Sequence, residues 1–134
     1  VLEHIPNQIE TLKMLKKKLK KNGTIIIEVP HAKDFLIETV NLKSFKNFTF
    51  WSEHLILHTE ESLNKFLKLA GFKKIEFIYY QRYNINNHFK WILENKPNGH
   101  NENKTMFNVN IQKRYNSFLE NSKLTDTLIA IAKI

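Results

Sequence analysis

The sequence contains no cysteine, only two arginines, and three residues each of glycine and proline. The lack of cysteine excludes disulfides and thiolate metal sites, and it fits a reducing compartment. No apolar stretch approaches the roughly 20 residues that a membrane-spanning helix needs, and no signal-peptide pattern is present. We therefore expect a cytoplasmic protein without a membrane span.

Glycine is also missing from the place where an open α/β sheet would use it. Such sheets hold a nucleotide-like cofactor with a Gly-rich turn after the first strand, and no such turn is present. The chain has no initiator Met and opens directly on an apolar-periodic helix. With 134 residues it is long enough for one domain, or a large piece of one, with a real core. We expect a chain that begins in mid-fold.

The net charge of +8 is carried mainly by lysine, with the densest group at residues 16–21. Apolar residues at a spacing of three or four predict a helix over about 6–21 with one buried stripe, and the lysines lie on its other faces. The stripe consists of Ile5, Ile9, Leu12, Leu15 and Leu19. Lysines near a helix C-terminus complement the helix dipole, which favours a solvated face over a nucleic-acid or anionic-membrane patch. We do not expect nucleic acid as a partner.

The order of elements predicts an α/β fold. After the first helix and Gly23, the apolar run 24–29 predicts a strand. Residues 31–58 show no regular spacing of apolar residues, and a connection of this length indicates a lid or short helices. A helix from Thr59 to Gly71 follows, then a strand over 72–80 and a final strand over 126–133. Between these strands, residues 81–125 predict two short helices. This pattern is typical of a parallel sheet with helices on both faces.

Several short segments together carry a resemblance to a known family. They are Leu2-Glu3-His4-Ile5-Pro6, Asn22-Gly23-Thr24, Ile27-Glu28-Val29-Pro30, Glu53-His54-Leu55 and Ala70-Gly71-Phe72. In this order and spacing they resemble the C-terminal half of a class I S-adenosylmethionine-dependent methyltransferase, a Rossmann-like fold. The segment 81–88, with 91 and 96–100, resembles an insertion found before the last strand in one bacterial branch of these enzymes.

The resemblance implies a fold and a domain organisation. Residues 24–29 and 72–80 would be the fifth and sixth strands, parallel to each other, and residues 127–133 the antiparallel seventh strand inserted between them, with flanking helices. Residues 1–80 and 126–134 would form the core of a single partial domain, and 81–125 an acceptor-side cap. S-adenosylmethionine would be the cofactor, with its main binding motif outside this chain. A small-molecule or sugar acceptor would be the substrate.

The resemblance also implies site residues. Glu3 and His4 take the family position that faces the methyl donor, so we expect them to bind the cofactor. The expected acceptor-binding residues are His31, Gln81, Arg82, Tyr83, Asn87, Trp91 and His100. Because the donor carries an activated methyl group, catalysis needs mainly positioning and a base. We expect His4, His88 and Glu3 to be catalytic. The alternatives are a His4 bonded to backbone, a His88 that makes a structural loop contact, and a Glu3 that only stabilises a helix terminus.

Metal binding is not expected. His54 and His58 have the spacing of zinc-binding helices, but Thr59-Glu60-Glu61 indicates a helix that starts only after His58. In an extended segment the two rings would lie about 13 Å apart, at about 3.3 Å per residue.

Two functional hypotheses follow. The first is a methyltransferase whose donor-binding half is absent from these residues. The second is a non-catalytic interaction module of the same fold. Both predict an unpaired sheet edge, through which we expect self-association. The enzyme hypothesis also predicts no measurable binding of S-adenosylmethionine to residues 1–134 alone.

Overall fold

The computed structural model describes residues 1–99 and 107–134. The described elements follow one another along the chain as η1 (Leu2–His4), α1 (Gln8–Lys18), β1 (Thr24–Pro30), α2 (Phe35–Glu38), α3 (Lys43–Thr49), α4 (Glu60–Leu69), β2 (Lys74–Tyr80), α5 (Ile85–Glu94), α6 (Val109–Asn121) and β3 (Thr127–Lys133). The expected helices and strands are confirmed, with bounds that differ by a few residues. The aromatic-rich stretch 31–58 contains the short helices α2 and α3.

Local sequence signals explain where α4 begins and ends. The Thr59 side chain accepts a hydrogen bond from the Ser62 backbone N–H, and the Ser62 hydroxyl accepts one from the Thr59 N–H. This reciprocal capping box satisfies two N–H groups that lack partners within the helix. Gly71 follows the helix with a φ of 90°, a left-handed conformation that glycine adopts without a steric cost. The predicted helix boundaries at Thr59 and Gly71 are therefore confirmed.

The sheet has the strand order β1-β3-β2, and β3 is antiparallel to both neighbours. All pairings among these three strands are thus antiparallel, and His31 and His58 form an isolated parallel bridge outside them. The parallel sheet expected from the order of elements is wrong for the described residues, whereas the pairing agrees with the antiparallel last strand between two others that the resemblance implied. β1 and β2 run in the same direction, but β3 lies between them and takes the hydrogen bonds that a parallel pair would have exchanged. The assignment of the strands as the fifth, sixth and seventh of a larger sheet stays a prediction.

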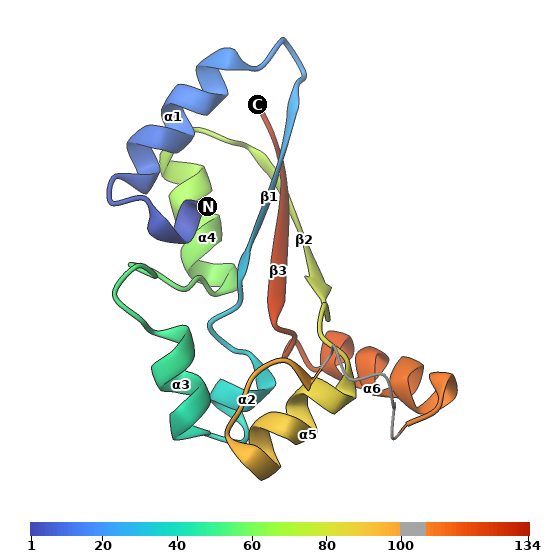
Figure 1. Ribbon diagram of the computed structural model, residues 1–134. Helices are drawn as coiled ribbons and strands as arrows, with labels where there is room; N and C mark the ends of the chain where they lie inside the picture. The colour runs from blue at the N-terminus through green and yellow to red at the C-terminus, as the bar shows by residue number, and fades with distance from the viewer. Residues whose placement is uncertain (100–106) are drawn as a thin grey trace.

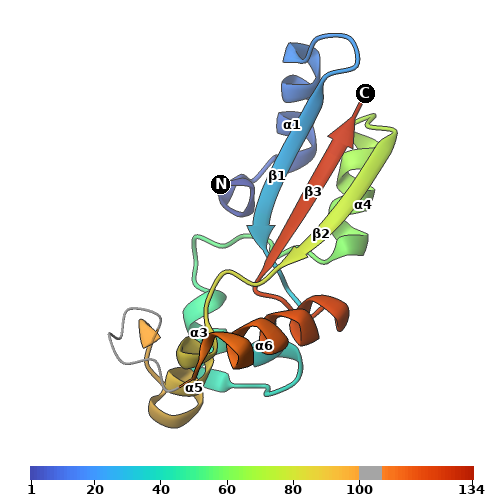
Figure 2. The same ribbon diagram turned by 90° about the vertical axis from the view of Figure 1, so that its right-hand side faces the viewer.

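One face of the sheet forms the hydrophobic core with α1 and α4 (Figure 1). Successive side chains along each strand point alternately toward this core and away from it. The fully buried core residues include Leu128 of β3 and, from the helix packed on it, Leu63 and Leu67 of α4. The opposite face is open in Figure 2, and Ile26 and Ile78 on it are 68% and 48% exposed. The expectation of helices on both faces is wrong for the described residues. Because successive side chains of a strand point to opposite faces, the run Ile25-Ile26-Ile27 does not bury all three residues.

Helices α2, α3, α5 and α6 gather beyond the end of the sheet where β1 and β2 finish (Figures 1 and 2). Asparagine side chains cap α5 and α6: Asn84 accepts from the Asn87 N–H and Asn108 from the Ile111 N–H. The two helices expected within 81–125 are confirmed. That this segment is a separate acceptor-side cap stays a prediction, although α2 and α3 from residues 31–58 lie in the same group.

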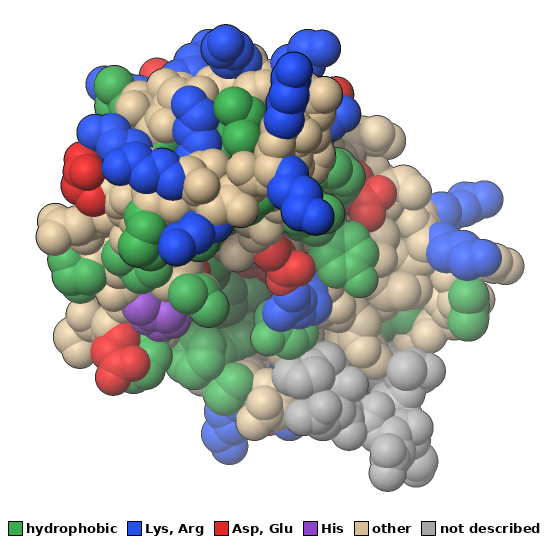
Figure 3. All heavy atoms as spheres, turned by 90° about the horizontal axis from the view of Figure 1, so that it is seen from above, with side chains coloured by type: hydrophobic (Ala, Val, Ile, Leu, Met, Phe, Trp, Pro, Cys, Tyr) green, Lys and Arg blue, Asp and Glu red, His purple; other side chains and the backbone are tan. Residues whose placement is uncertain are grey.

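The lysines of α1 occupy its solvent side, as expected. Lys17 and Lys18 are exposed, whereas Leu12 is buried. Leu15, expected in the buried stripe, is 38% exposed. Seen from above, Lys and Arg side chains are scattered among uncharged and hydrophobic ones (Figure 3). Within residues 1–99 and 107–134, none of the helices combines the length and the apolar character required to cross a membrane.

Candidate active site

The ends of the three strands bring a polar cluster together at one edge of the sheet. Pro30 and Tyr80, the last residues of β1 and β2, both lie opposite Thr127, the first residue of β3. His31, Gln81 and Asp126 flank these positions and therefore meet at the same edge. In open α/β sheets, ligands bind outside the carboxyl ends of the parallel strands, and this edge contains the carboxyl ends of β1 and β2.

Asp126 links the start of β3 to the segment after β2 through hydrogen bonds. Its carboxylate accepts hydrogen bonds from Gln81 Nε2 at 2.7 Å, from the backbone N–H groups of Arg82 and Tyr83 at 3.0 and 2.9 Å, and from the Thr127 hydroxyl at 2.7 Å. The Asp126 N–H donates in return to Gln81 Oε1 at 3.1 Å. Burial raises the pKa of Asp126, while these donors act in the opposite direction. The carboxylate thus fixes the segment that follows β2.

A cavity of about 220 Å³ opens beside this cluster. One wall is polar and the other is largely aromatic, because the rings of Phe45 and Phe48 pack against Trp91 with centroids 5.1 and 5.2 Å apart. The polar side chains that line the cavity are His31, Asp34, Thr49, His54, Tyr83, Asn87, Asn98 and Asp126. Such a combination is typical of a small-molecule site, in which apolar walls bury the ligand and a few polar groups orient it.

Two buried titratable groups line the cavity from the segment after β1. His31 donates from Nδ1 to the Thr125 carbonyl at 3.1 Å, and burial lowers its pKa. Asp34 is the N-cap of α2 and accepts from the Leu36 N–H at 2.6 Å. Burial raises the pKa of Asp34 to about 7. A carboxyl group with such a pKa exchanges protons near neutral pH, which makes Asp34 a candidate acid or base that the sequence did not reveal.

His88 is buried behind the cavity, on α5 rather than in the loop where we expected it. Its Nδ1 lies 2.6 Å from the Tyr115 hydroxyl, and its Nε2 lies 3.4 Å from Gln81 Nε2. The ring also stacks on Phe35. Burial lowers the pKa of His88 to about 4, so the imidazole is neutral at neutral pH. Neither His88 nor Gln81 is among the residues that line the cavity.

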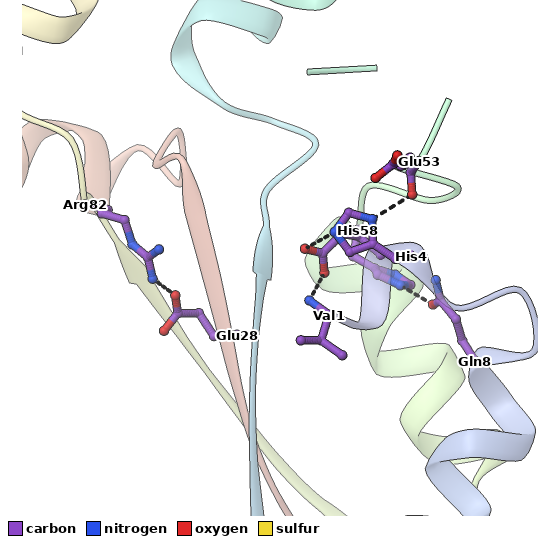
Figure 4. A network of polar contacts seen from close by, with 8 residues as sticks. Val1, His4, Gln8, Glu28, Glu53, His58 and Arg82 are labelled. Atoms are coloured by element: carbon purple, nitrogen blue, oxygen red, sulfur yellow. Dashed lines mark hydrogen bonds and ion pairs between the residues drawn. The ribbon is translucent and has the colours of Figure 1, made fainter. Parts of the chain in front are cut away.

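A second polar group lies next to the cavity and contains Glu3 and His4. His4 donates from Nδ1 to the Glu53 carbonyl at 2.7 Å, and its Nε2 lies 3.4 Å from Glu3 Oε1 (Figure 4). The His4 ring lies 4.9 Å from the ring of His54, which itself lines the cavity. His4 is thus bonded to backbone, as one alternative held, and it also keeps a ring nitrogen directed at a carboxylate.

Arg82 takes a different direction from its neighbours. Its guanidinium pairs with the Glu28 carboxylate across the exposed face of the sheet (Figure 4). Both side chains border a shallow groove of about 380 Å³ that also reaches Glu3 and Asp126. Arg82 therefore lies beside the cavity but does not line it.

Of the expected acceptor-binding residues, four line the cavity: His31, Tyr83, Asn87 and Trp91. His100 lies outside the described residues. Sequence reasoning missed Asp34, His54 and Tyr115 as parts of this region. Asp34 precedes a helix of only four residues, and Tyr115 reaches His88 from a distant helix. His58 is also absent from the cavity, because it is fully buried and bonded to Gln8 and Ser62.

Comparison with known proteins identifies the fold. A family model described as a methyltransferase domain matches residues 1–76, more than half of the chain. A SAM-dependent methyltransferase from Archaeoglobus fulgidus is similar with a TM-score of 0.54 and 19% identity, over 99% of this chain and 55% of that chain. One from Thermotoga maritima has a TM-score of 0.57 and 12% identity, over 98% of this chain and 51% of that chain. The chain thus spans about half the length of these structures.

No curated protein matched the chain. The similarity to one bacterial branch of the family, which rests on the segment 81–100, stays a prediction. The family match covers α1, β1 and α4, which form the core together with β3, a strand outside the matched residues. The chain belongs to the methyltransferase domain family.

Proposed function

We propose that the intact protein transfers a methyl group from S-adenosylmethionine to a small-molecule or sugar acceptor held in the cavity. The main support for this proposal is that the cavity lies at the carboxyl ends of β1 and β2 in a chain of the methyltransferase family. The two similar structures, both described as SAM-dependent, support the choice of donor. The donor would lie on the side of Glu3 and His4, where a shallow groove adjoins the cavity.

The walls of the cavity support an acceptor with one apolar face and several hydrogen-bonding groups. Phe45, Phe48 and Trp91 offer aromatic surface, on which a planar molecule or the apolar face of a sugar ring packs. Asn87 and Tyr83 lie on the polar side. A neutral His31 offers one ring nitrogen as an acceptor once Nδ1 has donated to the Thr125 carbonyl.

The chemistry asks for positioning and, for a protonated nucleophile, a base. His4 suits the base role best, because its Nδ1–H is held by the Glu53 carbonyl and its Nε2 is left to accept a proton beside Glu3. His88 has a pKa of about 4 and is a weak base. We propose that His88 acts through Gln81, which it contacts at the polar edge, as a positioning residue.

The second hypothesis, an interaction module, is favoured by one observation. The outer edge of β1 has no partner strand in the described residues, and an apolar groove of about 290 Å³ runs along it between β1 and α1. Leu15 and Ile26, both partly exposed, line this groove. A second copy of the chain or another segment would add a strand there. Size-exclusion chromatography of residues 1–134 is expected to show a dimer or larger species, and a clean monomer would contradict this.

Mass spectrometry of a methyl-transfer reaction tests the enzyme hypothesis. The intact protein is incubated with trideuteromethyl S-adenosylmethionine and a panel of nucleotide sugars and hydroxylated aromatic compounds. We expect one acceptor class to gain the labelled methyl group, and N87A to lower kcat/KM about tenfold or more. The control E61Q changes an exposed carboxylate on α4 and is expected to keep the full rate. Failure of the intact protein to bind S-adenosylmethionine by calorimetry would favour the interaction module.

A further inference from the structure

Three metal-ligating side chains from two separate segments meet beside the cavity. Glu3 and His4 belong to η1, and His54 precedes α4 by six residues. One ligand atom from each of these residues lies within 4.8 Å of the others. The backbone N–H of Leu55 donates to the Glu3 carbonyl at 2.8 Å and ties the two segments together. The fold therefore brings these three residues together, and no short sequence motif predicts the cluster.

The hydrogen bonds around the cluster prepare all three side chains as ligands. His4 donates from Nδ1 to the Glu53 carbonyl, and His54 donates from Nδ1 to the Thr49 carbonyl, each at 2.7 Å. Both imidazoles are thereby held in the tautomer whose Nε2 carries a lone pair. Metal-binding histidines almost always donate their other N–H in this way. The backbone nitrogen of Val1 likewise donates to Glu3 Oε2, which leaves Oε1 toward His4.

The distances suit a small divalent ion after a modest adjustment. Bonds of about 2.0–2.2 Å in tetrahedral geometry place neighbouring ligand atoms about 3.4 Å apart. His4 Nε2 and Glu3 Oε1 are already 3.4 Å apart. The remaining separations, at most 4.8 Å, close when the half-buried His54 side chain shifts by roughly 1 Å.

We propose that Glu3, His4 and His54 bind a late first-row divalent metal ion such as Zn²⁺ through one carboxylate oxygen and two Nε2 atoms. Two histidines and one carboxylate are an established ligand set for such ions, and three protein ligands leave a position open. Because His54 also lines the cavity, the ion would lie beside the proposed acceptor. Metal binding does not depend on the proposed methyl transfer.

The metal and the base role of His4 exclude each other, because both use the Nε2 lone pair. The simpler alternative to a metal site is an ion pair between Glu3 and a protonated His4. The two readings differ in what happens to His54, which has no role in the ion pair. Added Zn²⁺ would change the Nε2 atoms of His4 and His54 if they bind a metal, and would change neither if Glu3 and His4 form only an ion pair.

Titration of the intact protein with ZnCl₂, without donor or acceptor, tests the proposal. In long-range ¹H–¹⁵N spectra we expect the Nε2 resonances of His4 and His54 to shift, while their Nδ1–H donors and the other histidines stay unchanged. Calorimetry is expected to show one site, which E3Q, H4N or H54N weakens by at least about 100-fold. E53Q is the matched control, since Glu53 contributes only its backbone carbonyl, and it is expected to bind within about twofold of the parent.

Three outcomes would overturn the metal site. They are the absence of a Zn²⁺-dependent shift at His4 and His54, binding that moves other histidines instead, and an E53Q variant that loses as much affinity as E3Q. An ion pair alone would leave the parent protein without Zn²⁺ binding and without a Zn²⁺-dependent shift at either histidine. H4N changes an exposed side chain and is expected to fold, so the test does not depend on the more buried Glu3. Because no methyl transfer is measured, the result is independent of the proposed enzyme activity.

Discussion

The middle of the sheet and its polar edge bury different kinds of side chain. Between the sheet and the helices α1 and α4, the buried residues are almost all aliphatic, with Leu67 and Ala130 fully buried. At the edge below α4, the buried set includes His31, Asp34 and His88. The aliphatic part gains stability from apolar burial, whereas the edge holds polar groups at a cost that only hydrogen bonds offset. Stability and chemistry are thus concentrated in different parts of one small domain.

The largest effect is expected from a cavity in the aliphatic core. Leu67→Ala removes a fully buried side chain from α4 and is expected to lower the free energy of unfolding by about 2–5 kcal/mol. Leu69→Ala, on the same helix but 55% exposed, is expected to change it by less than about 0.5 kcal/mol. Urea denaturation measures both. Equal losses would mean that α4 does not pack as described.

A pH-dependent effect distinguishes the polar edge from the core. Burial raises the pKa of Asp34 to about 7 in the folded state, above its value of about 4 in the unfolded chain. The folded state therefore holds the proton more tightly, and the Asp34 contribution to stability is lost as the pH rises from about 4 to about 7. The loss amounts to at most about 4 kcal/mol, from about three pKa units.

The variant Asp34→Asn isolates this contribution. It keeps an oxygen that accepts from the Leu36 N–H but does not ionise, so we expect D34N to be more stable than the parent at pH 8, with the difference shrinking toward pH 4. Denaturation curves at several pH values measure this difference. Every other titratable side chain is the same in both proteins, so its contribution cancels in the difference. A difference that does not change with pH would show that Asp34 is not buried as described.

An intermediate effect is expected at Asp126. Asp126→Ala removes the carboxylate that accepts from the N–H groups of Arg82 and Tyr83, and we expect this to cost about 1–3 kcal/mol of stability. The Gln81 amide loses one acceptor and keeps the Tyr83 carbonyl at 2.8 Å. Asp126→Asn keeps part of the network and is expected to lose less. Thermal denaturation of both variants provides the comparison. If the alanine variant were as stable as the parent, the carboxylate would not be what fixes the segment after β2.

The smallest effect is expected where the two regions meet. The Tyr79 hydroxyl of β2 donates to Glu60 in the first turn of α4, and Lys123 pairs with the same carboxylate at 2.9 Å. Tyr79→Phe removes one hydrogen bond and is expected to cost about 1 kcal/mol. Tyr80→Phe, an exposed neighbour, is the matched control and is expected to have no effect. Chemical denaturation that gave equal values for both variants would show that the Tyr79 bond adds no stability.

Most of the elements were predictable from the sequence, because the signals are local. Thr59 and Gly71 mark the two ends of α4 through capping, and the apolar spacing in α1 is helical. The parallel sheet that the order of elements indicated is wrong for the described residues, because β3 lies between β1 and β2 and is antiparallel to both. The resemblance to a known family, and not the local pattern, implied this inserted antiparallel strand. The exposure of Ile26 was also missed, because an unbroken apolar run hides the alternation of faces.

The candidate site was predictable only in part. His31 directly follows β1 and lines the cavity, in agreement with the rule that ligands bind at the carboxyl ends of strands. Tyr83, which also lines the cavity, was expected only from the resemblance. His54 was examined only with His58, four residues away, whereas in the structure its partners are Glu3 and His4. The raised pKa of Asp34 arises from burial under helices that the sequence does not position. The partners of His54 and the burial of Asp34 both depend on contacts between distant segments of the chain.

The central position of β3 has a consequence for how the protein folds. Lys133 lies opposite both Thr24 and Lys74, so β1 and β2 reach each other only through this strand. Neither has a partner in the described sheet until residues 127–133 have been synthesised. Such long-range pairing slows folding and leaves two strands with unpaired edges in the nascent chain. β1 and β2 are therefore expected to gain their described sheet hydrogen bonds only once β3 is available to both.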